Sequence, residues 1–220
     1  MKIKAILTDL DGTLIDSIPL IMASDKEAIE HFGFKVSHQE LRDLSQMHSR
    51  EIAFHLMDTT KRVIDLFAFI NYRRRTFLKL LKERKHKDLW WPDAKWFLKE
   101  TAKGFKIGVI TGSRKMFVKE VFDAQTKKSV KTIITSDDVQ HKKPDIEPLL
   151  LALKKLKLRK SEVIFIGDSE QDGLMCQRLG VKFIAKEGGI STEHELRKYN
   201  PVFVGKNFSE IKSFIDNTHF

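Results

Sequence analysis

The sequence alternates short apolar runs with segments of helical periodicity, and this alternation restricts the fold more than any other feature. Each apolar run is followed at once by polar or turn-forming residues, as expected where a buried parallel strand ends at the carboxyl edge of a sheet. Regular alternation of strand and helix predicts an α/β fold with a Rossmann-like, doubly wound parallel sheet and right-handed crossovers. The predicted strands are residues 3–7, 107–110, 132–134, 163–166, 181–185 and 202–204.

Helical periodicity fills the intervals between these strands. In the second half of the chain the predicted helices are residues 94–102, 115–124, 146–156, 171–179 and 209–215. The interval after the first strand differs, because it contains only helical patterns: residues 18–32, 39–47, 49–57 and 60 to about 85. A crossover needs one helix, so we predict an inserted all-helical cap domain at residues 16–90. Residues 1–15 and 91–220 would then form the Rossmann-like core.

The composition indicates a packed protein in a reducing compartment. A hydrophobic fraction of 41% with 16 Phe is enough for a core. The single cysteine, Cys176, cannot form an internal disulfide, and its apolar helical surroundings suit a small core residue. The apolar run near Met1 is too short for a signal peptide, and no run of about 18 apolar residues occurs. We therefore expect a soluble cytoplasmic protein without a membrane partner.

A formal net charge of +10 raises the possibility of nucleic-acid binding. The basic residues are spread along the chain, although they are locally dense at residues 73–75 and 82–87. This distribution favours a lysine-rich surface that attracts small anionic substrates over a nucleic-acid track. The sequence does not predict an oligomeric state.

Polar residues gather where the predicted strands end. Asp9-Leu10-Asp11-Gly12-Thr13-Leu14 follows the first strand, Thr111-Gly112-Ser113 follows the second, and Gly167-Asp168-Ser169-Glu170-Gln171-Asp172 follows the fourth. Lys142-Lys143-Pro144 precedes the helix that leads into the fourth strand. Ligands of doubly wound sheets bind outside the carboxyl ends of the strands. We therefore expect these carboxylates, hydroxyls and ammonium groups to meet at one edge.

Such a set of side chains is suited to phosphoryl transfer. Several carboxylates at one edge repel each other unless a cation holds them, and oxygen ligands without His or Cys favour Mg²⁺. A carboxylate can attack phosphorus and form an acyl-phosphate that water then hydrolyses. A second carboxyl two residues further on points to the same side of an extended chain, where it can protonate the leaving oxygen.

With these four motifs in order, the whole sequence resembles the haloacid dehalogenase-like phosphohydrolases. It is most similar to the branch with a helical cap after the first strand, which includes phosphoglycolate phosphatase and β-phosphoglucomutase. The resemblance implies that Asp9 is the nucleophile and Asp11 the general acid and base. It implies Mg²⁺ bound by Asp9, Asp168 and the backbone carbonyl of Asp11, with Asp172 in support.

The resemblance also implies how the phosphoryl group is held. Thr111 and Lys143 would bind its oxygens, helped by backbone N–H groups near Gly12 and Gly112. His48, Ser49 and Arg50 are candidates for substrate contacts in the cap, and one or two of Arg73, Arg74 and Arg75 could face the cleft. The cap would close over the cleft and exclude water.

Simpler structural roles compete with several of these assignments. Asp-Gly is a frequent turn pair, and Asp172 could complement a helix dipole. Ser113 is better placed than Thr111 to cap the next helix, and Lys142 is expected on the surface. The three tryptophans, Trp90, Trp91 and Trp96, are interpreted as packing between cap and core.

The predicted function is a Mg²⁺-dependent phosphatase that hydrolyses small organic phosphate monoesters, such as phosphoglycolate or sugar phosphates, through an aspartyl-phosphate. A phosphomutase of the β-phosphoglucomutase type is the alternative within the family. A nucleic-acid-binding protein and a non-catalytic interaction module are the alternatives from other classes.

Overall fold

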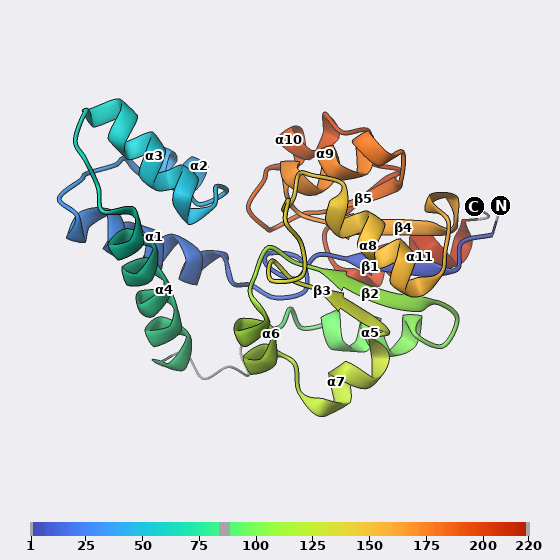
Figure 1. The fold of residues 1–220 in the computed structure, drawn as a ribbon. Helices are drawn as coiled ribbons and strands as arrows, with labels where there is room; N and C mark the ends of the chain where they lie inside the picture. Colours follow the sequence, from blue (N-terminus) through green and yellow to red (C-terminus); the bar gives the residue numbers. More distant parts are fainter. Residues whose placement is uncertain (1, 84–88, 219–220) are drawn as a thin grey trace. The chain divides into compact units, whose positions relative to one another are not determined.

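The computed structural model describes residues 2–83 and 89–218. These residues form two compact units: residues 2–16 with 89–218, and residues 17–83. We call them the core unit and the helical unit. The core unit contains the sheet of Figure 1, whose strands are β1 (Ala5–Thr8), β2 (Lys106–Ile110), β3 (Thr132–Ile134), β4 (Val163–Gly167), β5 (Lys182–Lys186) and β6 (Phe203–Gly205). All six predicted strands are therefore confirmed, with small shifts at their ends.

The sheet is parallel throughout and has the order β3-β2-β1-β4-β5-β6. The order reverses between β1 and β4, which is the place where ligands bind in doubly wound sheets. Thr8 is in register with Val109 of β2 and with Ile166 of β4, so these three strands end at the same level. The segments that follow β1, β2 and β4 consequently start side by side.

Helices cover both faces of this sheet (Figure 1). They are α5 (Ala94–Thr101), α6 (Lys115–Val121), α7 (Ala124–Ser129), α8 (Glu147–Leu156), α9 (Glu170–Leu179), α10 (Glu193–Arg197) and α11 (Phe208–Asn217). Helix α8 packs on β2 and β3, and α9 packs on β4 and β5. Cys176 of α9 is fully buried in the apolar cluster on this side, as expected for a core residue. On α5 and α11, the rings of Phe97 and Phe208 pack in a tilted arrangement with their centroids 4.7 Å apart.

The helical unit consists of α1 (Ile18–His31), α2 (His38–Leu44), α3 (Ser49–Thr60) and α4 (Leu66–Glu83). It has its own apolar core, which includes Ile29 of α1, Leu44 of α2, Ile52 of α3 and Phe69 of α4. The helical patterns along this segment thus form a separately packed body.

The two chain segments that border the helical unit pair with each other inside the core unit. The amide of Asp16 donates to the carbonyl of Leu89 (2.7 Å), the amide of Trp91 donates to Leu14 (3.2 Å), and Ile15 bridges Trp90 in antiparallel fashion. This pairing explains why the compact units divide at residues 16 and 89, close to the predicted boundaries of 16 and 90.

Two predicted helices differ from the structure. The helix predicted from residue 60 begins only at Leu66, because Thr60 still belongs to α3 and Lys61 ends α3 in a left-handed conformation (φ 55°). The last residues of that predicted helix lie outside the described residues. The pattern over 115–124 ends at Val121, since Phe122 is extended and the carboxylate of Asp123 accepts from the amide of Thr126 to begin α7.

Two further observations complete the fold. Helix α10 was not predicted, although Thr192 and Glu195 form the reciprocal cap that marks a helix start. Within the described residues, no helix is both long and apolar enough to cross a membrane.

Candidate functional site

The predicted site residues meet at the carboxyl edge of the central strands. Asp9 follows β1, Thr111 follows β2 and Asp168 follows β4. The amide of Asp9 donates to Ile166 of β4 at 2.9 Å, which continues the sheet one residue past β1. Strand register therefore places residues from distant parts of the chain next to each other, as the sequence predicts.

Three carboxylates and one ammonium form a buried cluster at this edge. Asp9, Asp168 and Asp172 each offer a carboxylate oxygen, and these oxygens lie within 4.8 Å of one another. The Lys143 Nζ lies 2.8 Å from Asp9 Oδ1 and 2.7 Å from Asp172 Oδ1. All four side chains are at most 6% exposed. Lys142, by contrast, is exposed, as predicted.

Burial and mutual repulsion raise the proton affinity of this cluster. Burial raises the pKa of Asp9 well above its usual value, opposed by Lys143 and reinforced by Asp172 and Asp168. Burial also raises the pKa of Asp168 to about 6, together with the charge of Asp172. For Lys143, burial lowers the pKa, but Asp172 and Asp9 outweigh it and keep the ammonium protonated. The single positive charge of Lys143 is therefore not enough to keep the pKa values of Asp9 and Asp168 at their usual level.

The chemistry of this cluster fits a divalent cation. With every group ionised, three negative charges and one positive charge leave a net of −2 in a buried site. The ligand atoms are oxygens, which are the donors that Mg²⁺ prefers. Asp9, Asp168 and Asp172 are therefore the residues that could hold Mg²⁺. The side chain of Asp11, also named in the predicted metal set, lies outside this group of three, and its predicted contribution is a backbone carbonyl.

Asp168 is held from two sides. Its Oδ1 accepts a hydrogen bond from Thr13 Oγ1, and its Oδ2 accepts one from the amide of Ile190 at 2.9 Å. Gly12 has a φ of 77°, and a Cβ there would collide with the Asp168 carboxylate; a Cβ on Gly189 would do the same. Gly12 is therefore required both for its conformation and for the close approach of the loop. The contributions of Thr13, Gly189 and Ile190 were not predicted.

Asp172 has two roles in the structure. Its Oδ2 accepts from the amide and the hydroxyl of Ser169, which forms the reciprocal cap at the start of α9. Its Oδ1 pairs with Lys143. Asp172 therefore caps the start of α9 with one carboxylate oxygen and joins the buried cluster with the other.

Asp11 lies beside the cluster and is held by two hydroxyls. Its Oδ2 accepts from Thr111 Oγ1 at 2.9 Å and from Ser113 Oγ at 2.7 Å. The amide of Ser113 in turn donates to Thr111 Oγ1 at 2.9 Å. The prediction that Ser113 caps the next helix is wrong, because Arg114 occupies the N-cap position of α6 and the Ser113 side chain turns to Asp11. Gly112, between the two hydroxyl residues, is exposed.

The tryptophans differ in their surroundings. The Trp90 indole donates to the carbonyl of Val121 at 3.3 Å, and the Trp91 indole donates to the carbonyl of Gly12 at the same distance. Trp96 is 46% exposed on α5, and its packing between cap and core stays a prediction. Trp91 consequently contacts the loop that follows β1, a position that its sequence context did not indicate.

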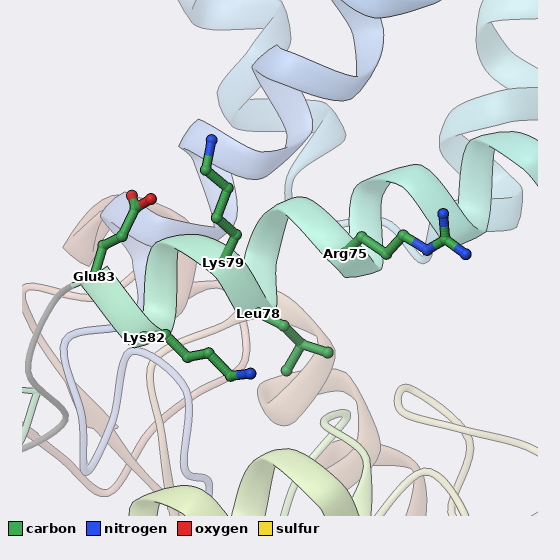
Figure 2. Close-up of a pocket in the computed structure, with 5 residues that line it drawn as sticks. All are labelled: Arg75, Leu78, Lys79, Lys82 and Glu83. Carbon is green, nitrogen blue, oxygen red and sulfur yellow. The ribbon is translucent and has the colours of Figure 1, made fainter.

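A separate hollow of about 400 Å³ lies on α4 of the helical unit (Figure 2). Arg75, Lys79 and Lys82 border it at a spacing that places them on one side of the helix, around Leu78 and near Glu83. All three basic side chains are exposed. The hollow lacks any close group of acidic, His or Cys residues, since within the described residues that feature is found only in the core cluster.

Comparison with known proteins bears on this site. The sequence profile described as haloacid dehalogenase-like hydrolase matches residues 6–186. A pyrophosphatase PpaX of Bacillus pumilus is 28% identical over 238 residues, covering 97% of this chain and 96% of that protein. A phosphoglycolate phosphatase of Vibrio parahaemolyticus is 26% identical, covering 95% and 94%. The crystal structure of a hydrolase from Pseudomonas syringae has the same fold, with a TM-score of 0.83 at 21% identity, covering 99% of this chain and 100% of that one.

Proposed function

The chain belongs to the haloacid dehalogenase-like hydrolase family and is a phosphatase, and we propose that it hydrolyses small phosphorylated molecules in a Mg²⁺-dependent reaction through an aspartyl-phosphate on Asp9. The observation that carries this proposal is the cluster of three buried carboxylates balanced by a single ammonium. A structural ion pair would not need the surplus of two negative charges. A divalent cation bound among the carboxylates would offset this surplus.

In the proposed reaction, a carboxylate oxygen of Asp9 attacks phosphorus and the bond from phosphorus to the leaving oxygen breaks. Lys143 lies against Asp9 and would also neutralise charge on the phosphoryl group. Bound Mg²⁺ would supply further neutralisation of the phosphoryl oxygens. Thr111 and the backbone near Gly12 and Gly112 would orient those oxygens.

Asp11 would carry the protons in both halves of the reaction. It would first donate a proton to the leaving oxygen. Water would then attack phosphorus of the aspartyl-phosphate, giving its proton to Asp11 and releasing phosphate from Asp9. Support for this role comes from the two hydroxyls that orient the Asp11 carboxylate, which sits beside the buried cluster and outside it.

The proposed substrates are small organic phosphates, with pyrophosphate as a specific second candidate. Several relatives bear the name pyrophosphatase, and another bears the name phosphoglycolate phosphatase. In pyrophosphate, the leaving group is a phosphate rather than an alkoxide, so it depends less on a proton from Asp11.

The test is a phosphate-release assay on purified protein with pyrophosphate, phosphoglycolate and a set of sugar phosphates, with Mg²⁺ present and with a chelator. We expect Mg²⁺-dependent release and a preference of at least tenfold in kcat/KM for one substrate class. Absence of release from all of them would overturn the proposal. Isomerisation of a hexose phosphate without release would instead indicate a phosphomutase.

A further inference from the structure

Two loops of the core unit surround Asp168, and each provides one of its hydrogen bonds. Residues 9–14, the β1 loop, provide the hydroxyl of Thr13. Residues 187–191, the β5 loop, provide the amide of Ile190. Both loops also touch the Asp168 carboxylate with a glycine, Gly12 on one side and Gly189 on the other. The orientation of Asp168 therefore depends on the spacing of these two loops.

One side-chain pair, Trp91 and Lys186, joins these two loops. The Trp91 indole N–H donates to the carbonyl of Gly12 in the β1 loop. The Lys186 ammonium, at the end of β5, lies 4.2 Å from the centre of the Trp91 ring and donates to the carbonyl of Glu187 at 2.8 Å. A Cβ added on Gly188 would lie 3.9 Å from both Lys186 Nζ and the Trp91 ring, so the β5 loop passes close to Trp91 and Lys186.

Lys186 is an almost fully buried lysine. A lysine is rarely buried unless paired, yet this side chain is only 2% exposed. Burial lowers the pKa of its ammonium, while the charge of Asp168 acts to raise it. A cation held over an aromatic ring in a desolvated place interacts with it more strongly than at the surface. Trp91 and Lys186 thus connect Gly12 of the β1 loop to Glu187 of the β5 loop through a hydrogen bond at each end and a cation–π contact between them.

We propose that the pair of Trp91 and Lys186 positions Asp168 for Mg²⁺ by tying the β1 loop to the β5 loop. The inference rests on the proposed function, because it assigns Asp168 to the metal. Trp91 and Lys186 are positioning residues, since they act through Gly12, Thr13 and the β5 loop. Second-layer partners of metal ligands commonly change metal affinity by about 10–100-fold when they are replaced.

The experiment compares Trp91→Phe and Trp91→Leu with Trp96→Phe as the matched control. Phenylalanine keeps a ring for Lys186 and removes the N–H to Gly12, whereas leucine removes both. A cavity of about 360 Å³ borders Trp91 and Lys186, so water can enter beside the shortened side chain. Trp96 is an exposed tryptophan of the same unit without an indole hydrogen bond to the site loops.

The main readout is the Mg²⁺ dissociation constant, measured by calorimetry without substrate. We expect it to rise about threefold in Trp91→Phe and about tenfold in Trp91→Leu, and to stay unchanged in Trp96→Phe. The KM for the phosphorylated substrate should change less than the Mg²⁺ concentration that gives half-maximal rate. In an Asp168→Asn background, Trp91→Leu should have no further effect on Mg²⁺ binding.

The possible failures are distinguishable. A wild-type protein that binds no Mg²⁺ would overturn the proposed function and this inference with it. Wild-type Mg²⁺ affinity in a folded Trp91→Leu variant, with only a lower unfolding temperature, would assign the pair a purely structural role and leave the proposed function intact. An equal loss of Mg²⁺ affinity in the Asp168→Asn background would also overturn the inference.

Discussion

The two units each bury an ionic group, and the two groups differ in their charge balance. In the helical unit, Asp25 of α1 is fully buried and pairs with Arg73 of α4, whose Nη1 donates to Ser49 of α3 at 2.8 Å. One acid meets one base, and the contacts join three helices. In the core unit, three buried acids meet one base.

This difference distinguishes an ion pair that stabilises the fold from a cluster of acids whose charge is not balanced. A balanced pair tolerates burial because each charge neutralises the other, and removing one partner leaves an isolated buried charge. In an unbalanced cluster, burial and the neighbouring carboxylates raise the pKa values of the acids, and a bound cation would lower these pKa values again. Substitutions in the helical unit should therefore affect folding, whereas matched substitutions in the core unit should affect catalysis and metal binding. The following predictions test this contrast, from the largest effect to the smallest.

Asp9→Asn should abolish turnover, with a loss of at least about 10³-fold in kcat, because it removes the proposed nucleophile. The metal-free fold should remain intact, and its free energy of unfolding should not fall, because one of the mutually repelling carboxylates becomes neutral. Phosphate release and urea denaturation measure the two effects. Full activity of Asp9→Asn would remove Asp9 from the nucleophile role.

Asp25→Asn should lower the free energy of unfolding by about 2–4 kcal/mol, because it leaves Arg73 without its buried counter-charge. Chemical denaturation measures this loss. The control is Asp58→Asn, which removes an exposed ion pair with Lys61 and should change stability by less than about 1 kcal/mol. Equal stability of the two variants would contradict a structural role for the Asp25–Arg73 pair.

Mg²⁺ should stabilise the protein more at about pH 7.5 than at about pH 5. The folded-state pKa of Asp168 is about 6, above its ordinary value of 3.8. The folded metal-free protein therefore binds this proton more tightly than the unfolded chain, and stability falls as the pH rises through about 6. The loss is at most about 3 kcal/mol from this group.

Thermal unfolding with Mg²⁺ and with a chelator at both pH values measures this dependence. Mg²⁺ binds the ionised carboxylates and should recover the stability lost at the higher pH. The same experiment on the Asp168→Asn variant is the control, and its Mg²⁺ effect should depend less on pH. A Mg²⁺ effect that grows as the pH falls would contradict the assignment of the cluster as a metal site.

Ser113→Ala should lower kcat by about threefold to tenfold with little change in KM, because Asp11 keeps the hydrogen bond from Thr111 and loses the one from Ser113. Steady-state kinetics at saturating Mg²⁺ measure the effect. Ser213→Ala, at an exposed position of α11, is the control and should have wild-type kinetics. A change in KM alone would place Ser113 at the substrate rather than at Asp11.

Local pattern predicted the sheet well and the helix breaks poorly. Apolar runs such as residues 163–166 are long enough to define a buried strand by themselves. The break between α6 and α7 depends on Asp123, whose carboxylate competes with the helix for the amide of Thr126. Lys61 ends α3 in a left-handed conformation that its residue type does not favour. Neither feature changes the hydrophobic period, so periodicity alone misplaced the boundary between α3 and α4 and missed the break between α6 and α7.

The site shows the same division between local and distant information. The motif after β1 made Asp9 and Asp11 candidates, because two acids directly after a buried strand have few structural uses. The role of Ser113 was missed, because a serine before a helix is a common cap and its real partner lies 102 residues away. Trp91 and Lys186 were missed as well, since their shared partner loops come together only in the folded core unit.

The sequence by itself determined the succession of strands and helices along the chain, the acids at the strand ends and the helical segment after the first strand. It could do so because strand and helix periodicity and turn chemistry act over a few residues. Only the tertiary structure decided which acids form the buried cluster, which hydroxyls bind Asp11 and which groups donate to Asp168. The physical reason is that parallel register and loop packing bring together groups more than 100 residues apart, and a hydrogen bond or an ion pair depends on distances of about 3 Å.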